Sequence, residues 1–201
     1  MKRINFNDRY RLTQAVIEGL KTVTRRIEGG RQFQLAATAA EDITCEEDSG
    51  CIVMCCQGIA IFRHKCRYKV GDVVAVAQSY EAAGFDPECS IEGMLYAKKH
   101  AGWRNKMFVG AKYMPHQIRI TGIRCEPLWV ISDGGGEEEG VCVEFARNGR
   151  PMYYYFDAKR YREVWFDTPR EAFAALIDKV SGRGTWKRNP WVVVYEFELL
   201  K

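Results

Sequence analysis

The segment "GLKTVTRRIEGG" (residues 19–30) holds the residue types with the clearest chemistry in this chain. Thr24 carries a hydroxyl that becomes a nucleophile when a base takes its proton. Lys21 is such a base once burial or a neighbouring cation lowers its pKa. Arg25 and Arg26 follow directly, and their planar guanidinium groups suit a phosphate or a carboxylate. The segment therefore predicts either a ligand site or a polar helix end that faces water.

A short helix is expected to position these side chains. Apolar residues recur at helical spacing through "NDRYRLTQAVIEGLK", and Asn7 or Asp8 can cap its start. Gly19 weakens the helix just before Lys21. We therefore expect Lys21 and Thr24, three residues apart, to share a face on the last helical turn. The structural alternative is that both groups simply bind the carbonyls at a helix C-terminus, where cations are favoured in any case.

Strands and one clear helix are expected in the rest of the chain. "YKVGDVVAVAQSYE" (residues 68–81) and "WVVVYEFELL" (residues 191–200) are typical of strands, the latter with its first half buried on both faces. "QIRITGIRCEPL" alternates apolar and polar residues, which directs Arg119 to solvent or to a ligand. "TPREAFAALIDKVSG" has a capping-box start and one apolar stripe, so it predicts a helix. Because strands and helices do not alternate regularly, an α+β fold is expected, with mixed strands in a barrel and short helices at its edges.

Composition indicates an ordinary folded chain. At 201 residues with 47% hydrophobic residues, one domain over residues 1–201 is the expected organisation. No apolar run is long enough to cross a bilayer and the first residues lack a secretory signal, so a cytoplasmic protein without a membrane partner is expected. The eight cysteines are accordingly expected to be reduced thiols.

The sequence does not favour a metal or a cofactor. The candidates for zinc are in one cysteine-rich segment, but they form no pair of C-x-x-C motifs, so buried free thiols are the preferred interpretation. The candidates are Cys51, Cys55, Cys56, His64 and Cys66. Neither a P-loop nor a dinucleotide-binding glycine pattern is present, so ATP and NAD are not implied.

The distribution of charge leaves two possibilities open. The net charge is only +4, but basic residues concentrate in residues 1–33, 101–125 and 179–190. If these segments meet in space, they would attract a polyanion such as nucleic acid. The alternative is three separate solvated surfaces that never converge. Trp129 and Trp186 can likewise either stack on a base or pack in the core.

Several segments together resemble the ASCH-domain family, which has the PUA-like β-barrel fold. They are "GLKTVTRR", "YKVGDVVAV", "MPHQIRITGIRCEPLWVIS", "FDTPREAFAALIDKV" and "NPWVVVYEFE", and they run in the family's order from about residue 4 to residue 199. The signature G-x-K-T-x-T-x-R is the most specific part, and it matches at Gly19, Lys21, Thr22, Thr24 and Arg26. Insertions at about residues 28–66, 84–113 and 140–163 separate the matching segments, and a hairpin is expected around "CIVMCC" and "IAIF" in the first.

This resemblance implies recognition of RNA or a modified nucleoside in a cleft beside the sheet. The cleft would be lined by Lys21, Thr22, Thr24, Arg26 and Glu139. From their residue types and places in the sequence, Arg25 and Arg119 join Thr22 and Arg26 as ligand-binding candidates. One branch of the family hydrolyses N4-acetylcytidine, and the match implies that Lys21, Thr24 and Glu139 would be the catalytic residues. The family usually has a short helix before this glutamate, whereas this chain has "DGGG".

A third possibility, of another class, is a non-catalytic interaction module or a phage-derived accessory module.

Overall fold

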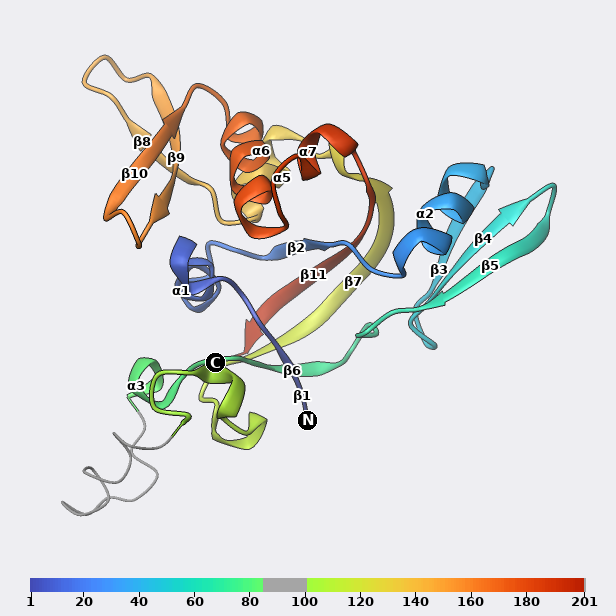
Figure 1. Ribbon diagram of the computed structural model, residues 1–201, viewed down its shortest axis with the longest axis horizontal. Coiled ribbons are helices and arrows are strands. Elements are labelled where there is room, and N and C mark those ends of the chain that lie inside the picture. Colours follow the sequence, from blue (N-terminus) through green and yellow to red (C-terminus); the bar gives the residue numbers. More distant parts are fainter. Residues whose placement is uncertain (85–100, 201) are drawn as a thin grey trace.

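The structure is a computed structural model that describes residues 1–84 and 101–200 (Figure 1). Strands make up most of its regular structure, as expected for an α+β fold. The strands are β1 (Lys2–Ile4), β2 (Val23–Arg26), β3 (Asp42–Glu46), β4 (Cys51–Cys56), β5 (Ile59–Lys65), β6 (Val73–Val76), β7 (Gln117–Pro127), β8 (Cys142–Phe145), β9 (Pro151–Asp157), β10 (Arg162–Phe166) and β11 (Trp191–Leu200).

The helices are short, and several are single 3-10 turns. The α-helices are α1 (Leu12–Ile17), α2 (Gly30–Ala39), α3 (Tyr80–Ala83), α5 (Asp133–Glu138), α6 (Pro169–Val180) and α7 (Thr185–Arg188). The 3-10 helices are η1 (Asp8–Tyr10), η2 (Lys106–Phe108), η3 (Ala111–Tyr113) and η4 (Leu128–Val130). Among the described residues, no helix is long and apolar enough to span a membrane.

A five-stranded sheet forms the centre of the molecule, in the order β1-β6-β7-β11-β2. The pair β1–β6 is parallel, and the other three pairs are antiparallel. The pairings among the described residues do not join β1 to β2, so they do not close this sheet into a barrel. The mixed α and β class predicted from the sequence is therefore confirmed, and the PUA-like barrel stays a prediction.

Two smaller sheets lie on opposite sides of the central sheet (Figure 1). The segment at residues 28–66 contains helix α2 and the sheet β3-β4-β5, which confirms the predicted hairpin as β4 and β5. The segment at residues 140–163 contains β8, β9 and the start of β10. Of the segment predicted at residues 84–113, residues 85–100 lie outside the described part of the chain.

The structure corrects the predicted end of the first helix. Helix α1 ends at Ile17 and Gly19 has φ +74°, so Lys21 lies in a loop. Thr24 lies in strand β2, where it pairs with Tyr195 of β11. Lys21 and Thr24 thus share no helical turn. The β-branched residues of "TVT" favour an extended chain, and the partner strand β11 provides the ladder for it.

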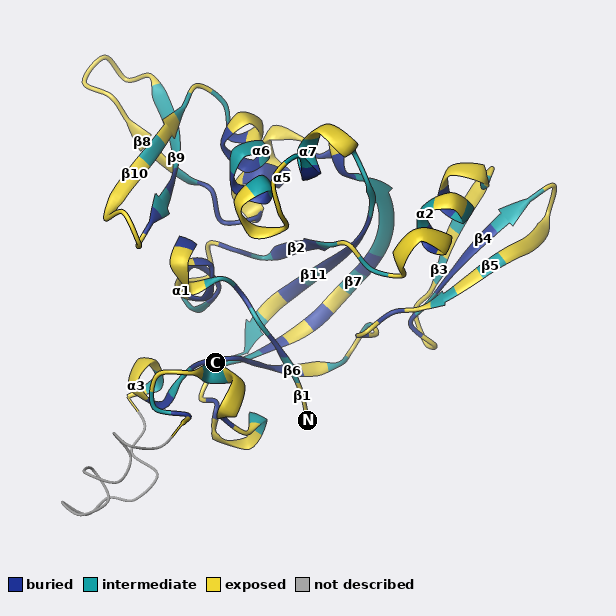
Figure 2. Ribbon diagram, viewed as in Figure 1, coloured by how far each residue is buried: buried dark blue, intermediate teal, exposed yellow. Residues whose placement is uncertain are grey.

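One large cluster of buried side chains includes residues from all three sheets and from α6 (Figure 2). Val192, Val193, Val194 and Tyr195 are each at most 1% exposed, which confirms that the first half of β11 is buried on both faces. Helix α6 also begins as predicted, because the hydroxyl of Thr168 accepts a hydrogen bond from a backbone N–H of the first turn. Buried side chains of this helix join this cluster beside α5, β9 and β10, and three of them line the cavity described below.

The seven described cysteines are free thiols, and Cys89 lies outside the described residues. Burial raises the pKa of Cys66 to about 12, so this thiol stays protonated at neutral pH. In the described part of the chain, no group of three or more His, Cys, Asp or Glu side chains is placed to hold a metal ion.

Candidate functional site

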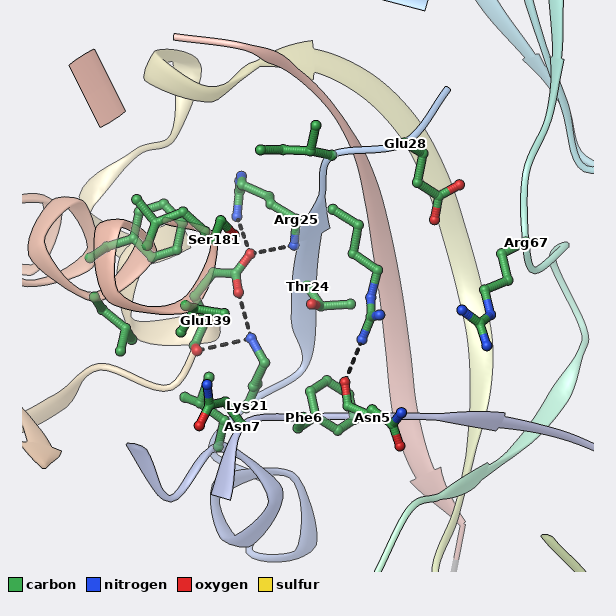
Figure 3. A pocket seen from close by; sticks show the side chains of 17 residues that line it. Asn5, Phe6, Asn7, Lys21, Thr24, Arg25, Glu28, Arg67, Glu139 and Ser181 are labelled. Atoms are coloured by element: carbon green, nitrogen blue, oxygen red, sulfur yellow. Dashed lines mark hydrogen bonds and ion pairs between the residues drawn. The ribbon is translucent and has the colours of Figure 1, made fainter. Parts of the chain in front are cut away.

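A cavity of about 540 Å³ lies between strand β2, the segment that follows β1, and helix α6 (Figure 3). Its volume falls within the range of about 300–1,000 Å³ that is typical of small-molecule sites. Apolar side chains of α6 form one wall, and polar side chains of the "KTVTRRIE" segment form another. Five of the predicted site residues contribute to the lining: Lys21, Thr24, Arg25, Arg26 and Glu139.

Lys21 is buried in the wall of this cavity, with only 2% of its surface exposed. Its Nζ donates to the backbone oxygen of Val23 at 2.7 Å, to that of Glu139 at 2.9 Å and to Oε2 of Glu139 at 2.5 Å. These three acceptors match the three donors of an ammonium group. The ammonium group of Lys21 is therefore held between Val23 on one side and Glu139 on the other.

Glu139 reaches Lys21 because helix α5 ends beside the outer edge of strand β2. The backbone N–H of Arg25 donates to Oε1 of Glu139 at 2.7 Å, and the N–H of Thr22 donates to the carbonyl of Glu138 at 3.0 Å. The carboxylate thus satisfies a donor that an edge strand would otherwise leave without a partner. The structure places the implied glutamate in direct contact with the signature lysine.

The "DGGG" segment forms the short helix α5 before Glu139, although glycine has a poor helix propensity. Ser132 caps helix α5 by accepting from the N–H of Gly135 at 3.1 Å. A Cβ added to Gly136 would lie 2.9 Å from the carbonyl oxygen of Pro169 at the start of α6. The glycine is therefore needed for the close approach of the two helices, which overrides its poor helix propensity.

The charge state of Lys21 is determined by opposing effects. Burial lowers the pKa of Lys21 below its ordinary value, and the charge of Glu139 and its hydrogen bond act in the opposite direction. Arg26 and Arg25 lower the pKa further by like-charge repulsion, as expected from the sequence. The net direction is downward, which favours loss of the lysine proton more than in water.

Thr24 presents its side chain to the same cavity. The residue is 6% exposed, and its hydroxyl makes no hydrogen bond with any residue that the structure describes. Most buried hydroxyl groups have a partner, so a hydroxyl without one beside a cavity is available to a ligand.

The two arginines of the signature segment have different surroundings. Arg25 is 3% exposed in its side chain and forms ion pairs with Glu126 at 3.0 Å and Glu139 at 3.3 Å. Arg26 donates from Nη2 to the backbone oxygen of Asn5 at 2.8 Å, and its buried Nε has no partner among the described residues. Side chains alternate along a strand, so Arg25 faces the acids while Arg26 shares a face with Thr24. Arg25 therefore stabilises the site, and Arg26 has a donor to offer.

Two predicted ligand-binding residues lie outside the cavity. Thr22 does not line the cavity. Its backbone oxygen accepts a hydrogen bond from the N–H of Phe197 at 2.9 Å, which holds the start of β2 against β11. Arg119 lies on β7 and forms an exposed ion pair with Glu198 at 3.0 Å. Alternation along β7 directs Arg119 to solvent, which was one of its two predicted orientations. Trp129 and Trp186 contact each other at 6.4 Å between ring centroids, also outside the cavity lining.

The cavity also contains residues that the sequence did not single out. The ring of Phe6 lies 5.8 Å from the Nζ of Lys21 and 5.7 Å from the guanidinium of Arg26. Glu28 and Arg67 line the cavity as well (Figure 3). In an extended chain, every second side chain points the same way, so Thr24, Arg26 and Glu28 share one face. The sequence would have predicted Glu28 in the site if "TRRIE" had been assigned to a strand.

Comparison with known proteins gives no match. No protein-family model matches the chain, and neither a curated protein nor a solved structure matches it.

Proposed function

We propose that the cavity binds a modified nucleoside, with N4-acetylcytidine as the first candidate. The observation that carries this proposal is a cavity of nucleoside-binding size that is lined by Arg26 and by Thr24, whose hydroxyl makes no hydrogen bond with any described residue. Phe6 adds an aromatic surface beside them, and every nucleobase has a face that stacks on such a ring. The "GLKTVTRR" segment resembles the signature of the ASCH-domain family, whose PUA-like members typically bind RNA or modified bases. This resemblance supports the same class of ligand.

A second function, hydrolysis of the acetyl group, is favoured by the 2.5 Å contact between Lys21 and Glu139. Passage of the ammonium proton to the carboxylate through this contact leaves a neutral amine, which the lowered pKa of Lys21 promotes. The amine then accepts the proton of the Thr24 hydroxyl as its oxygen attacks the acetyl carbon. When the bond from that carbon to N4 breaks, Lys21 returns the proton to N4 and cytidine leaves.

The resulting acetyl-threonine is an ester, and water cleaves it to regenerate the hydroxyl and release acetate. Lys21 can take the proton of this water as the water oxygen attacks the ester carbon, and it returns that proton to the Thr24 oxygen when the ester bond breaks. The balanced reaction therefore converts N4-acetylcytidine and water into cytidine, acetate and one proton.

Incubation of the protein with N4-acetylcytidine, followed by chromatographic measurement of cytidine, tests the hydrolytic function. Release that disappears in Lys21→Met and in Thr24→Val supports it. Calorimetric titration of the same ligand into Lys21→Met/Glu139→Gln, which lacks the proposed base but keeps Thr24 and Arg26, tests binding without cleavage. Binding without release supports recognition alone. No detectable binding at millimolar ligand refutes both functions and favours an interaction module.

An RNA chain is the other ligand of this class, and it is distinguished by salt. Contacts to phosphates make affinity fall steeply as salt rises, whereas a single uncharged nucleoside shows little dependence. We expect N4-acetylcytidine to bind with nearly constant affinity between 50 and 200 mM salt, within about twofold. An oligonucleotide that binds much more tightly than the nucleoside, with a steep salt dependence, would instead assign the cavity to RNA.

A further inference from the structure

The end of the cavity away from Lys21 contains a second carboxylate, Glu28. Its two oxygens lie 3.0 and 3.1 Å from the hydroxyl of Tyr195, and Oε2 lies 3.4 Å from Nε2 of His64. Burial and the charge of Glu28 raise the pKa of Tyr195, so this hydroxyl remains a donor. Tyr195 and His64 thus hold the Glu28 carboxylate in place, and Glu28 lines the cavity.

Glu28 retains capacity for further hydrogen bonds. An ionised carboxylate offers about four acceptor positions. The hydroxyl of Tyr195 and the ring of His64 occupy at most two or three of them. The Glu28 side chain is 16% exposed and lines the cavity, so a ligand in the cavity can reach the remaining acceptor positions.

Arg67 provides donors at the same end of the cavity. Its backbone N–H donates to the hydroxyl of Tyr195 at 3.2 Å, which links its position to that of Glu28. Its side chain is exposed, and the guanidinium lies over the ring of Tyr68 at 5.7 Å from the centroid, which leaves its N–H groups without a hydrogen bond or ion pair to any residue that the structure describes. Figure 3 shows Glu28 and Arg67 on one side of Thr24, and Lys21 and Glu139 on the other.

We infer that Glu28 and Arg67 bind the hydroxyl groups of a ribose, so that the site selects ribonucleosides over 2′-deoxyribonucleosides. A hydroxyl group can donate to a carboxylate and accept from a guanidinium at the same time. A phosphate only accepts, and it would be repelled by Glu28. The pairing of a carboxylate with an unpaired guanidinium therefore fits neighbouring sugar hydroxyls better than it fits an anion. This inference rests on the proposed binding of a nucleoside.

The spacing of the two ends agrees with one nucleoside. Thr24 and Glu28 are four residues apart, so their Cα atoms are separated by at most about 14 Å even in a fully extended chain. The side chains of both residues line the cavity and shorten the gap between their polar groups. A base beside Thr24 and Phe6 would place its sugar toward Glu28.

The test measures binding by calorimetry in the Lys21→Met/Glu139→Gln protein, which lacks the proposed base and keeps Thr24, Arg26, Glu28 and Arg67. The ligands are N4-acetylcytosine, N4-acetylcytidine and N4-acetyl-2′-deoxycytidine. We expect the ribonucleoside to bind about tenfold more tightly than the deoxyribonucleoside, as for loss of one hydrogen bond to a charged group. Adding Glu28→Gln should reduce this ratio to about two or less, and Arg67→Met should reduce it as well.

Glu198→Gln is the matched control, since Glu198 is an exposed glutamate outside the cavity lining. It should leave the tenfold ratio unchanged. Equal affinities for the two nucleosides, or a ratio that survives both Glu28→Gln and Arg67→Met, would overturn the inference. Binding of the free base N4-acetylcytosine separates the two proposals. If it binds while the sugar makes no difference, the base site stands and the ribose site fails. If none of the three ligands binds, the proposed function fails.

Discussion

Removal of the Glu139 carboxylate should destabilise the protein strongly, because it leaves Lys21 as a buried cation without its counterion. Glu139 accepts from Lys21 Nζ at 2.5 Å, from the N–H of Arg25 at 2.7 Å and from its Nη1 at 3.3 Å. Lys21 and Glu139 are 2% and 5% exposed. Breaking a buried pair from one side costs about 3–5 kcal/mol. For a protein of this length, that lowers the melting temperature by roughly 6–20 °C.

The substitution Glu139→Gln keeps the shape of the side chain and removes its charge. Urea unfolding, followed by tryptophan fluorescence, measures the decrease in the free energy of unfolding. Glu137→Gln is the matched control, since Glu137 is exposed on the same helix, and it should change stability by no more than about 0.5 kcal/mol. In the double variant Lys21→Met/Glu139→Gln, no buried lysine cation remains. We therefore expect it to be more stable than Glu139→Gln alone.

The loss should also depend on pH in a defined direction. Burial already lowers the pKa of folded Lys21, and without Glu139 the pKa falls further, while the unfolded value stays near 10.4. The unfolded state then binds more protons than the folded state, so stability rises with pH up to the unfolded value. The difference between wild type and Glu139→Gln should therefore shrink from pH 6 to pH 9.5. A loss below about 1 kcal/mol, or a loss that grows with pH, would refute the assignment of Lys21 as a buried charged group.

Three further outcomes are expected. Thr24→Val should change stability by less than about 1 kcal/mol, because the hydroxyl has no partner to lose, while cytidine release should become undetectable; a large fall in melting temperature would contradict this. Asp157 accepts two 2.9 Å hydrogen bonds from Arg9, which hold the pKa of Asp157 at about 2, below its unfolded value. This contribution is present above the unfolded pKa and disappears as pH falls toward 2, so Asp157→Asn should show a smaller change in stability between pH 5 and pH 2 than wild type. Arg119→Gln removes only an exposed ion pair with Glu198, so titrations should show unchanged nucleoside binding and unfolding should show a change within about 1 kcal/mol.

The sequence alone determined the elements whose signals are local. Helix α6 begins at its predicted cap because Thr168 and the proline after it favour a helix start whatever surrounds them. Strand β11 follows from its run of β-branched and aromatic residues, and β4 and β5 form the predicted hairpin. The signature segment also identified four polar residues of the cavity lining before any contact was known: Lys21, Thr24, Arg25 and Arg26.

The tertiary structure alone decided how those polar groups are paired. Lys21 and Glu139 are 118 residues apart in the chain, and they meet because the end of α5 covers the edge of β2. No local pattern encodes this contact, since it depends on the packing of α5 against α6 at Gly136.

The assignment of the signature segment to a strand was likewise a tertiary result. A helical reading of Lys21 and Thr24 was locally plausible, but pairing with β11 fixes residues 23–26 as extended. In the extended segment, Arg25 forms ion pairs with the buried acids Glu126 and Glu139, while Arg26 shares a face with Thr24 and Glu28. Sequence determined which groups were available for chemistry, and strand pairing determined which neighbours each group has, because neighbouring side chains on a strand point in opposite directions.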